Sequence, residues 1–506
     1  MGAAYFWSNG ETKFAPVVLL CETQEVNTQQ TSTRTSTPTG WLDRTFHITE
    51  RGSTIGQELR GGLVTFFSMV YILVLNPLIL SGPDSTGAFL GGGNEPNVAA
   101  IAAGTALVAG IMTILMGAVA NFPLALAAGL GLNSIIAYTV VQLPGMTWAD
   151  GMGIIVIEGI VIVLLVITGL REAIFRAVPQ VLRTAISVGI GLFIALVGLV
   201  NAGIVSSGEG TPLVFGVNGS ISTWPLVVFI FGLFLAIALL ARRVKGAILW
   251  SIVISTVLAV VVEAVGKVGG WGLTEPKLTG SPINIPEFST LGEFSIVGPF
   301  QKLGVLAVAV LAFSVMLADF FDTMGTMVAV ASEGDLLDDD GNPPRTQAIL
   351  LVDSVGAIAG GMGGVSSNTS FVESATGVGE GARTGLSAIF TGILFLASTF
   401  LAPLFAVVPS QAAAPALVVV GFMMMQQVVD IDWEDLSVAI PAFITIIFMP
   451  FGYSITVGIG VGFIAYAFMQ TVIGKAKNVH PLMWITAGLF VIYFLMDPIT
   501  RALGIA

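Results

Sequence analysis

Apolar residues dominate this chain in stretches far longer than those of a soluble protein. The charge-free runs 96–149, 384–429 and 436–474 each exceed the about 20 apolar residues that cross a bilayer. We place hydrophobic segments at 60–81, 97–120, 124–141, 151–169, 181–203, 222–241, 246–264, 301–326, 345–363, 369–383, 384–407, 412–429, 452–474 and 480–500, with a further short apolar stretch at 436–449. The pattern predicts an all-α polytopic membrane protein with 14 transmembrane segments.

Composition narrows the function further. Only 10% of the 506 residues are charged, which excludes an ordinary soluble enzyme. With 2 histidines and 1 cysteine, we expect no disulfide framework, no metal site and no cofactor, and the net charge of −12 argues against a nucleic-acid partner. The chain also lacks HExxH and GxSxG motifs, so it is not expected to be an enzyme.

The distribution of charge predicts an orientation. Residues 1–55 read as a polar N-terminal tail, largely disordered and cytosolic. Lys and Arg are more frequent in the loops that lie inside when the N-terminus is inside. We therefore expect both termini on the cytoplasmic side of a cell (plasma) membrane, with the lipid bilayer around the spans.

The two halves of the chain match each other at an offset of roughly 247 falling to roughly 230 residues. Seven spans per half give the halves opposite orientations, as in the inverted repeats of secondary transporters. The expected division is a first repeat at 56–265 (spans 1–7), an extracellular loop at 266–299 and a second repeat at 300–506 (spans 8–14). In-order matches place Asn121 on Asn368, Pro179 on Pro409, Gly191 on Gly421 and Trp250 on Trp484.

Two glycine-interrupted segments are candidates for the broken helices that build transporter sites. One runs over 121–133 and contains Pro123, Gly129 and Gly131; the other runs over 360–373. Interrupted backbone at membrane depth must line a cavity or meet protein partners. The alternative for each segment is close helix packing through small residues.

Acidic residues inside apolar spans are costly and are functional hypotheses by default. Asp319 and Asp322 share a helix face at i and i+3, and no histidine lies in the interior of a span, so carboxylates are the plausible proton carriers. For Asp353 the alternative is a structural acid held by Ser or backbone donors, and for Glu158 a position near a helix start. The full set is Glu158, Asp319, Asp322, Asp353, Glu373 and Glu380.

These carboxylates and half-helix ends are suited to binding a small neutral ring. Carboxylates accept N–H groups, half-helix ends donate to ring nitrogens or carbonyls, and phenylalanines such as Phe371 stack on a flat heterocycle. An anionic substrate fits less well, because no basic residue is expected near the half-helices.

Three motifs resemble the signature segments of the AzgA-like branch of the nucleobase/cation symporter-2 superfamily. They are GLGLNSIIAYTV at 129–140, ADFFDTMGT at 318–326 and SFVESATGVGEGARTG at 370–385. The similarity covers roughly residues 42–503. Where the uracil and xanthine branches carry a histidine or a Gln-Asn pair, this chain carries Asp322 and Glu373-Ser374, which favours the purine branch.

The resemblance implies two inverted seven-helix repeats arranged as a core domain (spans 1–4 and 8–11) and a gate domain (spans 5–7 and 12–14). It also implies short strands before the half-helices of spans 3 and 10. Substrate contacts are implied for Gly131, Asn133, Asp319 and Glu373, with Asp322 close by.

We therefore predict proton-coupled uptake of purine nucleobases (adenine, guanine and hypoxanthine) by alternating access. Asp319, Asp322 and Glu373 are the expected proton-coupling residues, and Asp353, Glu380 and Phe371 are secondary candidates. The alternatives are a uracil or xanthine permease, or an anion exchanger on the same fold. The sequence leaves open the preferred purine, the choice between H⁺ and Na⁺, and whether the protein forms a homodimer through its gate domain.

Overall fold

The computed structural model of this chain describes residues 40–169, 177–208, 211–216, 219–272, 274–277, 281–338 and 342–495. Residues 1–39 of the predicted tail and residues 496–500 of the last predicted span lie outside the described residues. Within the described part, ten helices are long and apolar enough to cross a membrane, and four shorter apolar helices accompany them. The expected count of 14 crossings remains a prediction.

The first half of the chain is almost entirely helical. Its helices are α1 Trp41–Phe46, α2 Ile55–Met69, α3 Ile72–Leu80, α4 Val98–Leu115 with the π-helix η1 Met116–Ala120, α5 Leu130–Ile135 with the π-helix η2 Ile136–Val140, α6 Trp148–Thr168, α8 Gln180–Asn201, α9 Trp224–Ala241 and α10 Ala247–Gly266.

The second half is also almost entirely helical. Its helices are α11 Gly298–Glu333, kinked at Gly304, α12 Thr346–Met362, α13 Ser374–Gly379, α14 Gly385–Ser398, η3 Thr399–Leu401, α15 Ala402–Phe405, α16 Ser410–Met425, η4 Gln426–Asp430, α17 Leu436–Phe451, α18 Ile455–Val472, η5 Ala476–Asn478 and α19 Pro481–Phe494. The stretch predicted at 436–449 is thus a full helix, and the segment predicted at 369–383 holds a strand and only a six-residue helix.

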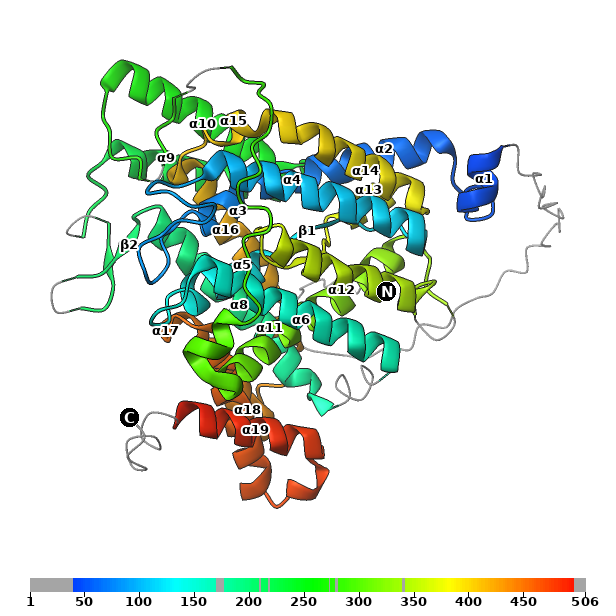
Figure 1. Cartoon of the computed structure of the whole chain (residues 1–506), viewed down its shortest axis with the longest axis vertical. Helices are drawn as coiled ribbons and strands as arrows, with labels where there is room; N and C mark the ends of the chain where they lie inside the picture. The colour runs from blue at the N-terminus through cyan, green and yellow to red at the C-terminus, as the bar shows by residue number, and fades with distance from the viewer. Residues whose placement is uncertain are drawn as a thin grey trace, which may run out of the picture.

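The helices pack in two groups. In one, α14 packs on α2 and α4, and α12 packs on α6; in the other, α16 and α17 pack on α8, and α10 and α16 pack on α9. Helices α18 and α19 pack together at one end of the longest axis, whereas the strand β1 lies near the middle of the molecule (Figure 1). The second group contacts the rest of the molecule through α16 on α3 and through α8 on α5 and α11.

The two halves are joined by a short strand pair. Strand β1 (Leu126–Ala128) pairs antiparallel with β4 (Asn368–Ser370), with Ala127 opposite Thr369. A second, peripheral pair joins β2 (Val205–Ser206) to β3 (Val214–Phe215). The expected strands before the half-helices of spans 3 and 10 are therefore confirmed.

The repeat matches have different outcomes. Pro179 and Pro409 occupy the same N-cap position of α8 and α16, and the matched Gly191 and Gly421 face each other: a Cβ on Gly191 would lie 2.7 Å from the Gly421 carbonyl oxygen. These matches are equivalent in the fold. The antiparallel strands pair with Ala127 opposite Thr369, so equivalent residues of the two halves lie 242 positions apart here (369 − 127). The predicted match of Asn121 to Asn368 assumed 247 positions and is therefore wrong.

The end of the predicted tail belongs to the folded body. Helix α1 ends at Phe46, whose carbonyl accepts a hydrogen bond from Asn121 Nδ2 at 2.9 Å. The Arg51 guanidinium donates to the carbonyls of Asn121 at 2.7 Å and Arg383 at 3.1 Å. These hydrogen bonds to backbone carbonyls attach residues 40–54 to the rest of the fold. The ordered part of the chain thus begins before residue 55, where the tail was predicted to end.

Candidate functional site

The strand pair places two half-helices at the centre of the molecule. Helix α5 begins just after β1, and α13 begins four residues after β4. The ladder continues beyond the strands, since Gly129 N–H donates to the Ser367 carbonyl at 2.9 Å and Phe371 N–H to the Ala125 carbonyl at 3.0 Å. Irregular backbone at this depth is therefore paired with protein, as a membrane interior requires.

Asn133 lies on α5 and is completely buried. Its Nδ2 donates to Asn76 Oδ1 at 2.5 Å, whereas its Oδ1 has no hydrogen-bond partner among the described residues. Asn76 in turn donates to Thr105 Oγ1 at 2.8 Å and to the Val365 carbonyl at 3.2 Å. This chain of amides orients Asn133 and leaves one acceptor without a protein donor.

Gly131 lies two residues before Asn133 on the same half-helix. A Cβ at this position would come within 2.8 Å of Ile190 Cγ2 on α8. The glycine therefore allows α8 to pack directly against the half-helix.

Glu373 precedes α13 and is partly buried. The buried Tyr71 hydroxyl, at the junction of α2 and α3, donates a hydrogen bond to Glu373 Oε1. Sequence reasoning missed both Tyr71 and Asn76, because each lies in an unremarkable apolar run of the first span.

The carboxylates of α11 differ in exposure. Asp319 is fully buried, and its Oδ2 accepts a hydrogen bond from Ser367 Oγ at 3.2 Å. Asp322, one turn later, is exposed and lies within electrostatic range of Asp353 and Glu373. The structure thus places acids of spans 8, 9 and 10 near one another, and their role in transport stays a prediction.

Asp353 is held as a structural acid. Its carboxylate accepts hydrogen bonds from Ser370 N–H at 3.0 Å, Ser370 Oγ at 2.7 Å and Thr323 Oγ1 at 2.8 Å. These donors join α12 to β4 and α11. The alternative of a buried acid satisfied by Ser and backbone donors accounts for this residue.

Glu380 and Phe371 are also placed by the structure. Glu380 follows α13 and forms ion pairs with Arg60 on α2 and Lys245 in the loop between α9 and α10. Phe371 is 7% exposed and packs within the main apolar core. Glu380 is therefore a paired acid at the C-terminal end of α13.

One basic residue, Arg183, lies beside helix α11. The Arg183 guanidinium, in the first turn of α8, lies 5.8 Å from the ring centroid of Phe321 on α11. The sequence pattern placed Arg183 at a span end, and only the packing of α8 on α11 brings it to Phe321.

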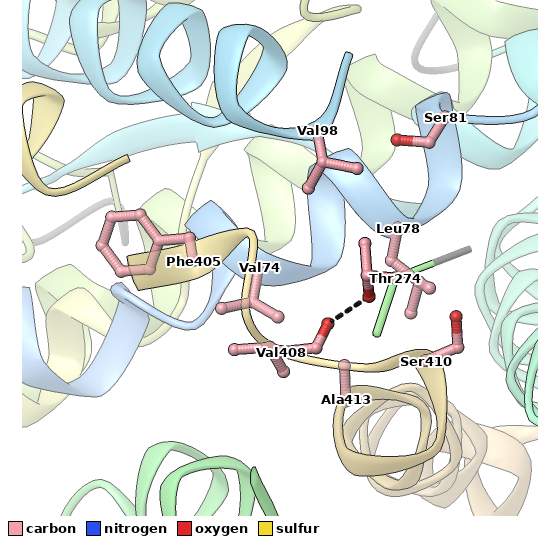
Figure 2. Close-up of a pocket in the computed structure, with 9 residues that line it drawn as sticks. All are labelled: Val74, Leu78, Ser81, Val98, Thr274, Phe405, Val408, Ser410 and Ala413. Carbon is pink, nitrogen blue, oxygen red and sulfur yellow. Dashed lines mark hydrogen bonds between the residues drawn. The ribbon is translucent and has the colours of Figure 1, made fainter. Parts of the chain in front are cut away.

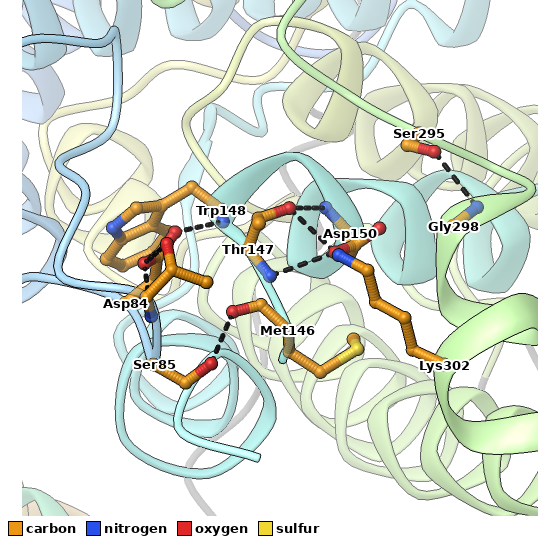
Figure 3. A network of polar contacts seen from close by, with 10 residues as sticks. Asp84, Ser85, Met146, Thr147, Trp148, Asp150, Ser295, Gly298 and Lys302 are labelled. Atoms are coloured by element: carbon orange, nitrogen blue, oxygen red, sulfur yellow. Dashed lines mark hydrogen bonds and ion pairs between the residues drawn. The ribbon is translucent and has the colours of Figure 1, made fainter. Parts of the chain in front are cut away.

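The beginnings of α6 and α11 are tied by a polar network (Figure 3). Lys302 Nζ binds Asp150 Oδ2 at 2.5 Å, and Asp150 forms a capping box with Thr147. Trp148 N–H donates to Asp84 Oδ2 at 3.1 Å. These contacts fix the relative position of two helices that carry buried acids further along.

Figure 2 shows a small hollow beside α3, the helix that also carries Asn76. It is lined mostly by apolar side chains, and Thr274 Oγ1 donates to the Val408 carbonyl at 2.9 Å across it. Its lining residues are Val74, Leu78, Ser81, Val98, Thr274, Phe405, Val408, Ser410 and Ala413. The hollow contains none of the predicted site residues. Among the residues that the structure describes, no group of three or more His, Cys, Asp or Glu is arranged to hold a metal ion.

Comparison with solved structures supports the predicted inverted-repeat transporter fold. The chain superposes on the transmembrane domain of the cyanobacterial bicarbonate transporter BicA with a TM-score of 0.56 at 16% identity, covering 80% of this chain and 96% of that one. The murine anion transporter Slc26a9 in its inward-facing state gives 0.58 at 12% identity, covering 88% and 74%. At this identity the likeness concerns the fold alone.

Comparison of sequences identifies the family. The adenine permease AdeP of Escherichia coli strain K12 is 37% identical over 456 residues, covering 90% of this chain and 96% of the relative. The guanine/hypoxanthine permease PbuG of Bacillus subtilis strain 168 is 38% identical over 454 residues, covering 89% and 98%. The Permease family itself matches residues 56–461. The chain therefore belongs to the Permease family, as its motifs predicted, and is a multi-pass membrane transport protein rather than an enzyme.

Proposed function

We propose that this protein takes up purine nucleobases (adenine, guanine and hypoxanthine) together with protons across the plasma membrane. The observation that carries the proposal is the cluster of Asn133, Asp319 and Glu373 around the β1–β4 pair, in a chain whose relatives include adenine and guanine/hypoxanthine permeases. Glu373 accepts N–H groups of the base, and Asn133 reads its other edge through the unpartnered Oδ1.

Alternating access is the proposed mode of transport. The core domain comprises spans 1–4 and 8–11 and carries the site, while the gate domain comprises spans 5–7 and 12–14 and packs against it. The termini face the cytoplasm. Asp322 is exposed whereas Asp319 is buried, so protons reach Asp319 from water by way of a neighbouring carboxylate.

Uptake of radiolabelled hypoxanthine by cells expressing the protein tests the proposal. Uptake is expected to be lost in Glu373→Gln and Asp319→Asn, and robust uptake by both variants would refute the carboxylate mechanism. An uncoupler is expected to abolish accumulation, whereas insensitivity would indicate Na⁺ coupling or facilitated diffusion.

Competition experiments separate the branches of the family. Unlabelled adenine and guanine are expected to compete with labelled hypoxanthine, whereas inhibition by uracil or xanthine instead would assign the chain to that branch. The Arg183 guanidinium near α11 favours one further candidate, anion exchange. Chloride or sulfate flux in proteoliposomes without purine flux would establish it.

A further inference from the structure

Glu158 on α6 is a buried acid without a visible donor. Its side chain is 0% exposed, and neither Oε1 nor Oε2 has a hydrogen-bond partner among the described residues. An isolated ionised carboxylate in such a place is strongly disfavoured, because burial removes its hydration without replacement. Each such group in a folded protein therefore requires an explanation.

The neighbour of Glu158 is the site residue Asp319. The two carboxyl groups lie close enough to interact directly, and Asp319 Oδ1 also has no hydrogen-bond partner in the described part of the chain. Helix α6 reaches this position by packing tightly on α12, where a Cβ on Gly159 would lie 2.8 Å from the Ile358 nitrogen. The packing of α6 thus places a second buried acid, Glu158, beside Asp319.

The other charged groups around Glu158 are accounted for by different partners. Asp353 on α12 is held by Ser370 and Thr323, and Glu373 by Tyr71. Asp322 on α11 is exposed, and Lys302, the cation at the beginning of α11, binds Asp150 instead. Asp353 thus has three hydrogen-bond donors, whereas Glu158 has none among the described residues, and Asp319 accepts one hydrogen bond, from Ser367 Oγ, with the Thr369 hydroxyl also beside it.

Two ionised carboxylates in contact have no hydrogen atom to share, and their charges repel. One proton removes both problems, because a protonated carboxyl donates to the carboxylate beside it and halves the buried charge. We propose that Glu158 and Asp319 together hold one proton, and that this shared proton is the one carried with the base. This inference rests on the proposed function and adds Glu158 as a proton-holding residue of its site.

The proton balance is simple. One proton from water enters the pair and forms an O–H bond that donates across it, and one base binds. After reorientation the base leaves, the O–H bond breaks, and the proton returns to water on the other side. One proton accompanies each base, and no other bond is made or broken.

Glu158→Gln tests the inference in proteoliposomes, because the glutamine amide donates permanently to Asp319 and mimics the protonated pair. Counterflow of labelled hypoxanthine, with base on both sides, is expected to persist. Accumulation driven by a pH gradient is expected to be lost, and hypoxanthine affinity no longer changes with pH, whereas in the wild type it changes about tenfold per pH unit where the pair titrates.

Controls separate the outcomes. Glu434→Gln, at an exposed acid before α17, makes the same chemical change and is expected to behave as wild type. Wild-type protein without hypoxanthine counterflow would refute the proposed function. Counterflow with intact gradient-driven accumulation in Glu158→Gln would refute the present inference alone.

A second measurement covers a Glu158→Gln variant that does not fold. Infrared spectra of the unliganded protein are expected to show a protonated-carboxyl band that Asp319→Asn removes, because the new amide supplies the donor to Glu158. This readout needs no transport. A band unchanged in Asp319→Asn would overturn the shared proton.

Discussion

Asn76 is predicted to control substrate affinity without contacting substrate. In Asn76→Ala, Asn133 Nδ2 and the Val365 carbonyl lose their partner, while Thr105 Oγ1 keeps its bond to the Ile101 carbonyl at 2.7 Å. Each orphaned buried group costs about 1–3 kcal/mol, so the free energy of unfolding falls by roughly 2–6 kcal/mol. Asn133 also loses its fixed orientation.

The loss of one correctly aimed hydrogen bond to the base corresponds to about 0.5–1.5 kcal/mol, or roughly 2- to 12-fold weaker hypoxanthine binding. Equilibrium binding to purified protein measures this effect, with thermal unfolding in parallel. Thr105→Val is the matched control, because it removes one partner of Asn76 and leaves the contact with Asn133 intact. Unchanged affinity in a folded Asn76→Ala protein would refute the orienting role of Asn76.

Three further predictions concern packing and charge. Gly191→Ala is expected to lower the unfolding free energy by about 1–3 kcal/mol, because its Cβ would overlap the Gly421 carbonyl, and thermal denaturation measures this. Burial raises the pKa of Glu293, although the hydrogen bond from the Gly91 N–H partly opposes this shift. The folded state therefore favours the protonated acid. The protein loses stability as pH rises from the ordinary carboxyl pKa through the raised pKa of the folded state. Glu293→Gln is therefore expected to stabilise the protein at neutral pH but not in acid, and a constant difference across the pH range would contradict this. The Lys245–Glu380 pair has an exposed lysine, so a double-mutant cycle with Lys245→Met and Glu380→Gln should give only about 0.2–1 kcal/mol of coupling.

The sequence predicted much of the architecture because membrane burial imposes strong patterns. Long apolar runs identified the spans, and matched prolines and glycines revealed the repeat, as the equivalent caps at Pro179 and Pro409 show. The repeat offset was less certain near the strands, where Asn121 was matched to Asn368. Insertions of a few residues shift a register without changing hydropathy, so only the strand pairing corrected it.

The acids of the site were found from sequence because a carboxylate in an apolar span is costly. The contacts that the site residues form with other spans were not predicted. Tyr71 and Asn76 lie in the first span and Glu158 in the fourth, and no local pattern distinguishes an apolar helix face that meets another helix from one that meets lipid.

The sequence by itself determined the membrane residence, the inverted repeat, the family and the carboxylates available for transport, because hydropathy and motif spacing are local properties. Only the tertiary structure decided which acids are paired and which lack donors: Asp353 is satisfied by three hydrogen bonds, Glu380 by cations, and Glu158 faces Asp319. Whether a buried charge is stabilised depends on donors brought from distant segments, and that information exists only once the helices have packed.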